Sequence, residues 1–184
     1  MPAAATTSRQ RAQLLPERTP KLKRGAQASV AVDYRAKDGV RSFSQRIASA
    51  SPVDIVEAER RGVPSVFVKD LADHMAITHV RLGAMLGISR ATVARKAAAN
   101  ERLDGQSGLA ALGIAKLLGL AQSLVDDSTA PAALEFDVAK WLGQWLEVPQ
   151  PALDGKAPAD FLDTPTGVQI VARLLGALQS GSYQ

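Results

Sequence analysis

The side chains best suited to a chemical task lie in a short basic segment near the middle of the chain. Arg90, Arg95 and Lys96 carry charged donors that can bind phosphate oxygens, and an arginine can also donate two hydrogen bonds to one guanine edge. Ser89 precedes them and is a residue type that caps helices. We therefore expect contacts with DNA from Ser89, Arg90, Ala91, Ala94, Arg95 and Lys96, with Arg102 as a lesser phosphate contact.

The spacing around this segment is that of a helix-turn-helix, the motif that places a recognition helix in the major groove of DNA. Gly87 stands where the turn needs a residue that tolerates positive φ, and Gly83 leaves room for two helices to approach each other. Apolar side chains fall where two crossed helices would bury them, at Leu82, Leu86, Ile88 and Val93. The pattern predicts a first helix over residues 79–86 and a second helix after Ser89.

A search for catalytic or metal-binding sets finds none. His74 and His79 are five residues apart, whereas ligands on one helical face are three or four apart. The adjacent Asp126 and Asp127 would point in different directions on a helix. The segment 105–108 has neither the lysine nor the preceding strand of a phosphate-binding loop. With no cysteine, a thiol nucleophile is excluded. We predict no enzymatic activity, no metal and no cofactor.

The elements that would position these residues are predicted to be mostly α-helical. Order is expected to begin at Ser51-Pro52, a helix cap followed by proline at the first helical position. Another helix is expected to begin near Ser65, and residues 100–108 are expected to form a polar loop. Residues 109–125 are apolar around most of the helix circumference, which indicates a helix buried in the core or at a subunit interface.

The last third of the chain is predicted to form a second organised unit. A helix is expected over residues 132–146, where Trp141 and Trp145 have the spacing of core residues. The proline-rich segment that follows cannot be helical throughout. Thr164-Pro165 would begin a final helix, which would end before Gly181. The apolar residues of this helix are Val168, Val171, Leu174, Leu175 and Leu178.

The charge is divided unevenly along the chain. Residues 1–50 hold ten basic and three acidic side chains, whereas the remainder holds 12 basic and 15 acidic ones. This composition predicts a basic, flexible N-terminal arm that either meets DNA phosphates or only solubilises the protein. No apolar run approaches the roughly 20 residues of a membrane span. Because the chain also lacks cysteine, which fits a reducing compartment, we expect a cytoplasmic protein without membrane contact.

Four segments together resemble the Xre/MbcA/ParS family of type II antitoxins, the partners of RES-domain toxins. Residues 51–64 resemble the lead-in helix of that family, and residues 86–95 are similar to its helix-turn-helix. Residues 141–167 resemble its most specific signature, in which a Trp-Leu pair precedes a proline-flanked turn and a Leu-Asp-Thr run. Residues 174–183 are similar to its ending, with two leucines, a glycine and an aromatic residue.

The resemblance implies three parts: a basic arm over residues 1–50, a helix-turn-helix domain over 51–128 and a toxin-binding domain over 129–184. It implies that the last helix and the tail cover the active site of an NAD-consuming, ADP-ribosyltransferase-like RES-domain toxin. The alternative for that helix is that it only closes the core of its domain. On this resemblance the toxin-binding residues are Val171, Leu174, Leu175, Leu178, Gly181, Ser182, Tyr183 and Gln184.

Two further partners are implied. The helix-turn-helix would bind operator DNA of the protein's own operon, and such readers usually act as symmetric dimers. We therefore expect a homodimer within a hetero-oligomeric toxin–antitoxin complex, with residues 109–125 as one candidate for the self-association face. The competing hypothesis is a stand-alone helix-turn-helix transcriptional regulator, whose C-terminal domain dimerises or senses a small molecule.

Overall fold

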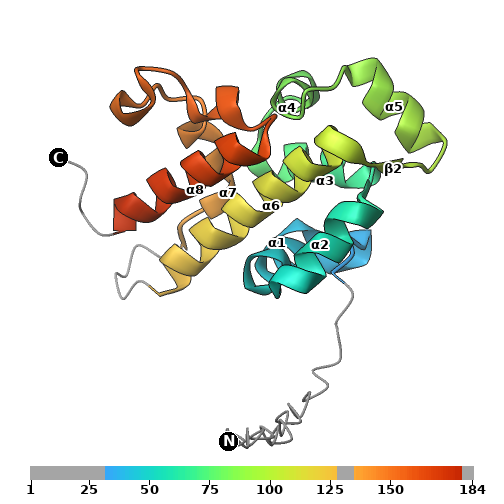
Figure 1. Ribbon diagram of the computed structural model, residues 1–184, viewed down its shortest axis with the longest axis horizontal. Coiled ribbons are helices and arrows are strands. Elements are labelled where there is room, and N and C mark those ends of the chain that lie inside the picture. The colour runs from blue at the N-terminus through green and yellow to red at the C-terminus, as the bar shows by residue number, and fades with distance from the viewer. Residues whose placement is uncertain (1–31, 128–134, 180–184) are drawn as a thin grey trace, which may run out of the picture.

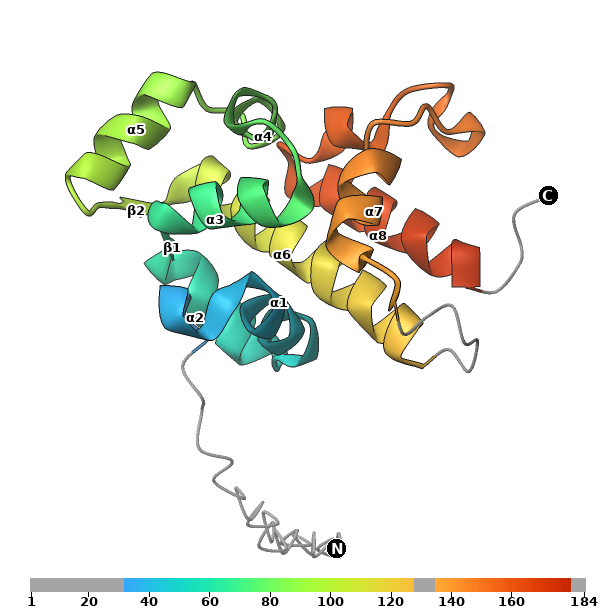
Figure 2. The ribbon, with the colours of Figure 1, turned by 180° about the vertical axis from the view of Figure 1, so that it is seen from behind.

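The computed structural model describes residues 32–127 and 135–179. The predicted mostly α fold is confirmed. In Figures 1 and 2, the longest helix, α6, runs through the middle of the molecule, and α5 lies at one edge. The elements in chain order are η1 (Ala36–Asp38), α1 (Gly39–Ser49), α2 (Pro52–Arg61), β1 (Val63–Pro64), α3 (Val66–Met75), α4 (His79–Met85), α5 (Arg90–Ala98), β2 (Arg102–Leu103), α6 (Gly105–Asp126), α7 (Val138–Trp145), η3 (Pro151–Leu153), η4 (Pro158–Phe161) and α8 (Pro165–Gln179).

Helix α6 is the centre of the hydrophobic core. Its side chains Ile114, Leu117 and Leu118 are fully buried, and α1, α7 and α8 all pack against it. Contrary to the sequence-based expectation, α6 is long and apolar enough to span a membrane, but most of its length is buried inside this fold. It is a core helix. Leu109, Lys116 and Leu120 of the same helix remain partly or fully exposed, so its role as a self-association face stays a prediction.

Order begins well before Ser51, and the prediction on this point was wrong. Helix α1 packs along α6, and its side chains Phe43 and Ile47 are buried in the common core. The two helices approach closely at Gly119, where an added Cβ atom would lie 2.2 Å from the carbonyl oxygen of Ser44. Residues 32–50 therefore belong to the folded body, and the predicted flexible arm can concern only residues 1–31, which lie outside the described residues.

Two basic residues of α1 form ion pairs within the chain. Arg41 forms an ion pair with Asp126 at the end of α6, with 3.3 Å between the charged atoms. Arg46 pairs with Asp38 at 3.6 Å. The first pair links α1 to α6 through two exposed side chains, whereas the second is local, because Asp38 directly precedes α1.

A short antiparallel pair of strands joins the two ends of the segment that contains α3, α4 and α5. Strand β1 pairs with β2, with Val63 opposite Leu103, and the chain between them forms α3, α4 and α5. Ser65 extends this closure, because its backbone N–H and its Oγ both donate to the carbonyl oxygen of Glu101, at 3.2 and 2.8 Å. The segment predicted as a loop over residues 100–108 thus contains a strand and, from Gly105, the first turn of α6.

The C-terminal unit differs from its prediction mainly at its first helix. Helix α7 begins at Val138, residues 136 and 137 are not helical, and residues 132–134 of the predicted helix lie outside the described part. Trp141 and Trp145 are stacked with 6.0 Å between ring centroids, and both are half-buried at the edge of the core. The start of the final helix is confirmed, since Thr164 Oγ1 accepts a hydrogen bond from the N–H of Gly167 at 3.1 Å.

Candidate functional site

The turn between α4 and α5 has the predicted helix-turn-helix geometry. Gly87 has a φ of 66°, a left-handed value that favours glycine. The N–H of Ile88 donates to the carbonyl oxygen of Gly83 at 2.9 Å, and a Cβ atom at Gly83 would lie 2.9 Å from the Ile88 carbonyl oxygen. Ser89 caps α5, because its Oγ accepts from the N–H of Thr92 at 3.1 Å. Both glycines and the cap thus have the roles that the sequence predicted.

Helix α5 presents most of its surface to solvent. It has no buried residue, and Figures 1 and 2 show it standing at the edge of the molecule. Arg90, Ala91, Ala94 and Arg95 are all exposed. Arg95 forms an ion pair with Glu101 at 3.4 Å, but 64% of its side chain stays accessible. An exposed helix with small and basic side chains is what a major groove can accommodate.

The other two predicted cations are held within the chain. The Nζ atom of Lys96 donates to the carbonyl oxygen of Arg102 at 3.0 Å and lies 3.5 Å from a carboxylate oxygen of Glu101, and only 19% of the side chain is exposed. The guanidinium group of Arg102 donates to Asp33 Oδ1 at 2.7 Å. The structure therefore places both cations in the connection between α5, β2 and the N-terminal segment, instead of directing them to an external phosphate.

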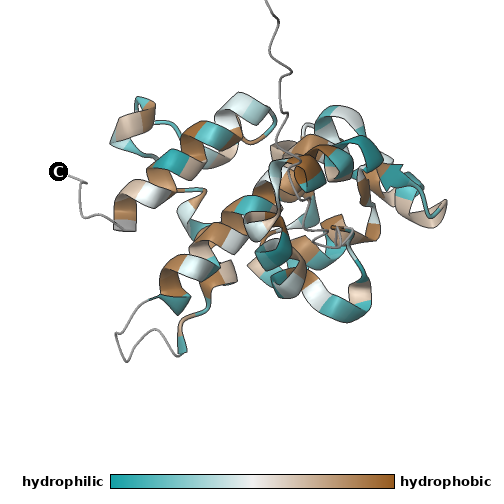
Figure 3. Cartoon of the chain, turned by 60° about the horizontal axis from the view of Figure 1, so that its bottom comes forward, coloured by the Kyte–Doolittle hydropathy of each residue, from teal (hydrophilic) through white to brown (hydrophobic). Residues whose placement is uncertain are grey.

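Helix α8 directs its predicted toxin-binding leucines inward. Val171 and Leu175 are fully buried, Leu174 is 8% exposed, and Leu178 is half-buried against the same core. Helix α8 packs on α6, and Figure 3 shows that hydrophobic and hydrophilic residues both occur along it. Val171, Leu174 and Leu175 therefore stabilise the fold and are not free to anchor a partner. The other predicted toxin-binding residues, Gly181, Ser182, Tyr183 and Gln184, lie outside the described residues.

The opposite face of α8 is a polar stripe that the sequence reasoning did not single out. Thr166, Gln169, Arg173 and Gly176 are exposed, at the three- and four-residue spacing of one helical face. Within residues 32–127 and 135–179, Arg173 has no ion-pair partner. An added Cβ atom at Gly176 would meet nothing within 4 Å. The sequence signal for this stripe is its three- and four-residue spacing. Polar residues at this spacing are common on helices, so the pattern alone does not indicate a binding surface.

The described part of the chain offers no metal-binding group of three or more His, Asp or Glu side chains. Its two histidines have separate environments. Burial lowers the pKa of His74, whereas His79 Nε2 lies 3.2 Å from Asp73 Oδ1.

Comparison with known proteins identifies two family domains along the chain. Residues 54–116 match the antitoxin Xre-like helix-turn-helix domain, and residues 121–181 match the antitoxin Xre/MbcA/ParS C-terminal toxin-binding domain. The curated Prs ADP-ribosylating antitoxin of Sphingobium sp. (strain YBL2) is 39% identical over 137 residues, which is 73% of this chain and 83% of that relative. The chain belongs to the Xre/MbcA/ParS family of antitoxins.

Family membership sets aside the competing hypothesis of a stand-alone regulator, because the chain carries a toxin-binding domain beside its helix-turn-helix. The two matched ranges meet inside α6, which runs from the first range into the second. Helix α1 lies before both ranges, although it packs onto the helix that they share. In this antitoxin, a helix outside both family domains therefore contributes to the core that joins them.

Proposed function

We propose that this antitoxin neutralises a RES-domain, ADP-ribosyltransferase-like toxin that consumes NAD, by covering the toxin's active site with the C-terminal helix and tail. This proposal rests on the match of residues 121–181 to the toxin-binding domain. It is also supported by a relative whose name combines antitoxin with ADP-ribosylating. The antitoxin acts by occupying a cleft, so it needs no catalytic group of its own.

The geometry of α8 supports a specific contact surface. Its apolar face is buried against α6, so the surface of α8 that a partner can reach is the exposed stripe of Thr166, Gln169, Arg173 and Gly176. Residues 180–184 would continue from this helix into the toxin, and Gly181, Ser182, Tyr183 and Gln184 would supply the tail contacts. Leu178, half-buried at the last described turns, would join the two parts of the interface.

We further propose that the antitoxin binds the operator of its own operon through α5 and represses transcription. Arg90, Ala91, Ala94 and Arg95 are accessible on the outer surface of the helix, and Ser89 lies at its N-terminus, which is the end that contacts bases in such motifs. Lys96 is a weaker part of this proposal, because contact with phosphate would require it to leave its partners in the chain.

We base the proposed quaternary structure on how helix-turn-helix proteins bind DNA. A helix-turn-helix protein that binds a palindromic operator does so as a symmetric dimer. We propose a homodimer that carries toxin on its C-terminal units and acts in the cytoplasm. The accessible residues of α6, such as Lys116 and the half-buried Leu120, remain one candidate for the dimer contact.

The neutralisation proposal is tested by co-expressing this chain with the neighbouring gene and measuring growth and cellular NAD. We expect the neighbour alone to arrest growth and deplete NAD, and the full antitoxin to restore both. A variant without residues 180–184 should fold normally, because the buried residues of α8 remain, but should fail to restore growth.

The purified proteins give the matched control. The full antitoxin should inhibit the toxin's consumption of NAD stoichiometrically, whereas the shortened chain should still fold but inhibit weakly. Tyr183→Ala, which removes one large side chain from the tail, should give an intermediate inhibition. If the shortened chain protects as fully as the intact one, the tail does not cover the active site and that mechanism is wrong.

A further inference from the structure

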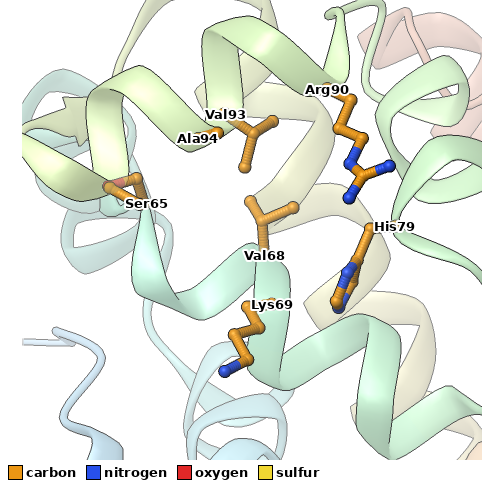
Figure 4. A pocket seen from close by; sticks show the side chains of 8 residues that line it. Ser65, Val68, Lys69, His79, Arg90, Val93 and Ala94 are labelled. Atoms are coloured by element: carbon orange, nitrogen blue, oxygen red, sulfur yellow. The ribbon is translucent and has the colours of Figure 1, made fainter.

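A pocket lies beneath the recognition helix, and two of the residues that line it, Arg90 and Ala94, are also proposed DNA contacts. It lies between α3 and α5 and has a volume of about 220 Å³. Val68 from α3 and Val93, Ala94 and Ala97 from α5 form its apolar walls. Figure 4 shows Val68 and Val93 pointing toward each other from the two helices. Helix α5, which forms one wall, has no buried residue, although Val93 packs against the core.

The apolar walls are edged by basic side chains. Lys69, His79 and Arg90 also line the pocket, and in Figure 4 Arg90 extends from α5 toward His79. Among the residues that the structure describes, Lys69 and Arg90 have neither an ion pair nor a side-chain hydrogen bond. Asp73 is the carboxylate partner of His79 at 3.2 Å. Two uncompensated positive charges therefore border an apolar space.

This combination fits one class of occupant. Apolar surface in contact with water favours an apolar occupant, because binding removes that surface from water. A free cation at its edge favours an anion, so the matching ligand has a carboxylate joined to a short apolar body. The volume is below the range of about 300–1,000 Å³ that is usual for drug-sized ligands, so the ligand is small. A DNA phosphate alone would leave the accessible apolar walls of Val93, Ala94 and Ala97 in contact with water.

We propose that the pocket between α3 and α5 binds a small aliphatic carboxylate, and that the bound carboxylate draws the Arg90 guanidinium away from DNA. The pocket would then be an effector site directly behind the recognition helix. The first half of this proposal stands on the pocket alone. The second half rests on the proposed operator binding through α5.

Three probes of graded chemistry test the site by NMR titration of the backbone amides of the full chain. Hexanoate has both the charge and the apolar body, hexanol has only the body, and acetate has only the charge. We expect saturable shifts at Val68, Lys69, Val93 and Ala94 with hexanoate, at least fivefold weaker binding of hexanol, and no saturation with acetate over the same range. Equal binding of hexanoate and hexanol, or no shifts near these residues, would overturn the site.

Matched variants separate this pocket from general charge effects. Lys69→Gln should weaken hexanoate binding to the level of hexanol, and Ala97→Leu should fill the pocket and weaken both. The control is Lys116→Gln, which removes the same charge from a smaller pocket of about 120 Å³ lined by Ile47 and Leu112. It should bind hexanoate like the wild type, and an equal loss in this control contradicts the proposal. If Ala97→Leu does not fold, as its spectrum would show, the two lysine variants decide.

The effect on DNA is measured separately, with the region upstream of the protein's own operon. Sodium hexanoate at a saturating concentration should weaken DNA binding severalfold relative to the same concentration of sodium acetate, and Lys69→Gln should reduce that difference. Unchanged DNA affinity with an occupied pocket overturns the role of Arg90 as the link. If the protein binds no DNA at all, the operator proposal fails, and the NMR titration still decides whether the pocket is a site.

Discussion

The basic residues on and after α5 differ in what holds them. Arg90 has no ion pair or side-chain hydrogen bond within the described residues, and Arg95 pairs with Glu101 but stays accessible. Lys96 and Arg102 are bound to carbonyl and carboxylate groups of the same chain. Residue type and position alone made Arg90, Arg95 and Lys96 candidates for DNA contacts, with Arg102 as a lesser one. Arg90 and Arg95 would therefore lose fewer existing contacts on binding DNA than Lys96 and Arg102 would.

Arg90→Ala is therefore expected to be the most informative change on α5. If Arg90 donates to a guanine, the variant should lose about 1–3 kcal/mol of operator binding and discriminate less between operator and unrelated DNA. Competition mobility-shift assays measure both quantities. Lys116→Ala removes one positive charge from α6 and should leave the discrimination unchanged. An equal loss on all DNA sequences would instead make Arg90 a phosphate contact.

A buried phenol gives a prediction for stability against pH. Tyr34 packs against Phe43 and Phe67 and donates a hydrogen bond from its hydroxyl to Asp70. Burial, together with this carboxylate, raises the pKa of Tyr34 far above its usual 10.0. The folded state then keeps a proton that the unfolded state releases above pH 10, so this contribution to stability is complete below pH 10 and falls as the pH rises further.

Tyr34→Phe should lower the free energy of unfolding by about 1 kcal/mol at pH 7, where a hydrogen bond is lost. The difference between wild type and variant should shrink as the pH rises above 10, because the variant has no phenol to ionise. Urea denaturation of both proteins at matched pH values measures this difference, in which the other titrating groups cancel. A difference that stays constant up to pH 11 would mean that the Tyr34 proton is not retained by the fold.

At the scale of elements, α8 shows what a periodic pattern can and cannot predict. Thr164 and Pro165 predicted its start because a cap is a local feature, and the structure confirms it. The stripe of Val171, Leu174 and Leu175 predicted an apolar face. Periodicity does not say whether such a face meets the same chain or another one, and here the answer is α6.

The same reasoning explains the two other misassigned elements. Helix α1 has only Val40, Phe43 and Ile47 as large apolar residues, and they lie in a segment whose charge suggested a tail. Its partner surface on α6 is more than 60 residues away in the sequence, so no local signal pointed to it. Residues 109–125, apolar all round, fitted a core helix and a subunit interface equally well. Only the tertiary structure shows that this helix lies in the core.

For a residue on the outer face of α8, we predict that one substitution raises the stability of the antitoxin and weakens its complex with the toxin. Gly176 is exposed, in a helix, and free of any neighbour that would require glycine. Gly176→Ala should therefore raise the free energy of unfolding by about 0.5–1 kcal/mol. If the toxin approaches the helix closely at this point, the added methyl group should weaken the toxin complex. Thermal unfolding and titration calorimetry with the toxin measure the two effects.

Ser123→Ala is the matched control for this pair of measurements. Ser123 is exposed on α6, where the change to alanine also favours the helical state but lies outside the proposed toxin surface. The control should be stabilised and should bind toxin like the wild type. If Gly176→Ala also binds toxin like the wild type, the outer stripe of α8 is not a close contact.

The whole molecule is held together by contacts between its DNA-reading and toxin-binding parts. Arg81 on α4 donates from Nε and from its terminal nitrogen to the two carboxylate oxygens of Glu147, at 2.7 and 2.8 Å. Gln106 at the start of α6 donates to the carbonyl oxygen of Asp163, just before α8, at 2.8 Å. With α6 running through both parts, the antitoxin has one continuous core.

This continuity predicts where the chain can be shortened. The described core begins at Val32, so a variant without residues 1–31 should unfold in urea within about 1 kcal/mol of the full chain. A variant without residues 1–50 would lose Tyr34, Phe43 and Ile47 from the core, and each buried side chain of this size contributes about 1.5–3 kcal/mol. Small domains have only about 5–15 kcal/mol in total. We therefore expect the longer deletion to abolish the cooperative transition. Equal urea midpoints for both deletions would show that α1 is not part of the cooperative fold. Removing an integral helix would expose the surface of α6 that it covers and would lower the midpoint.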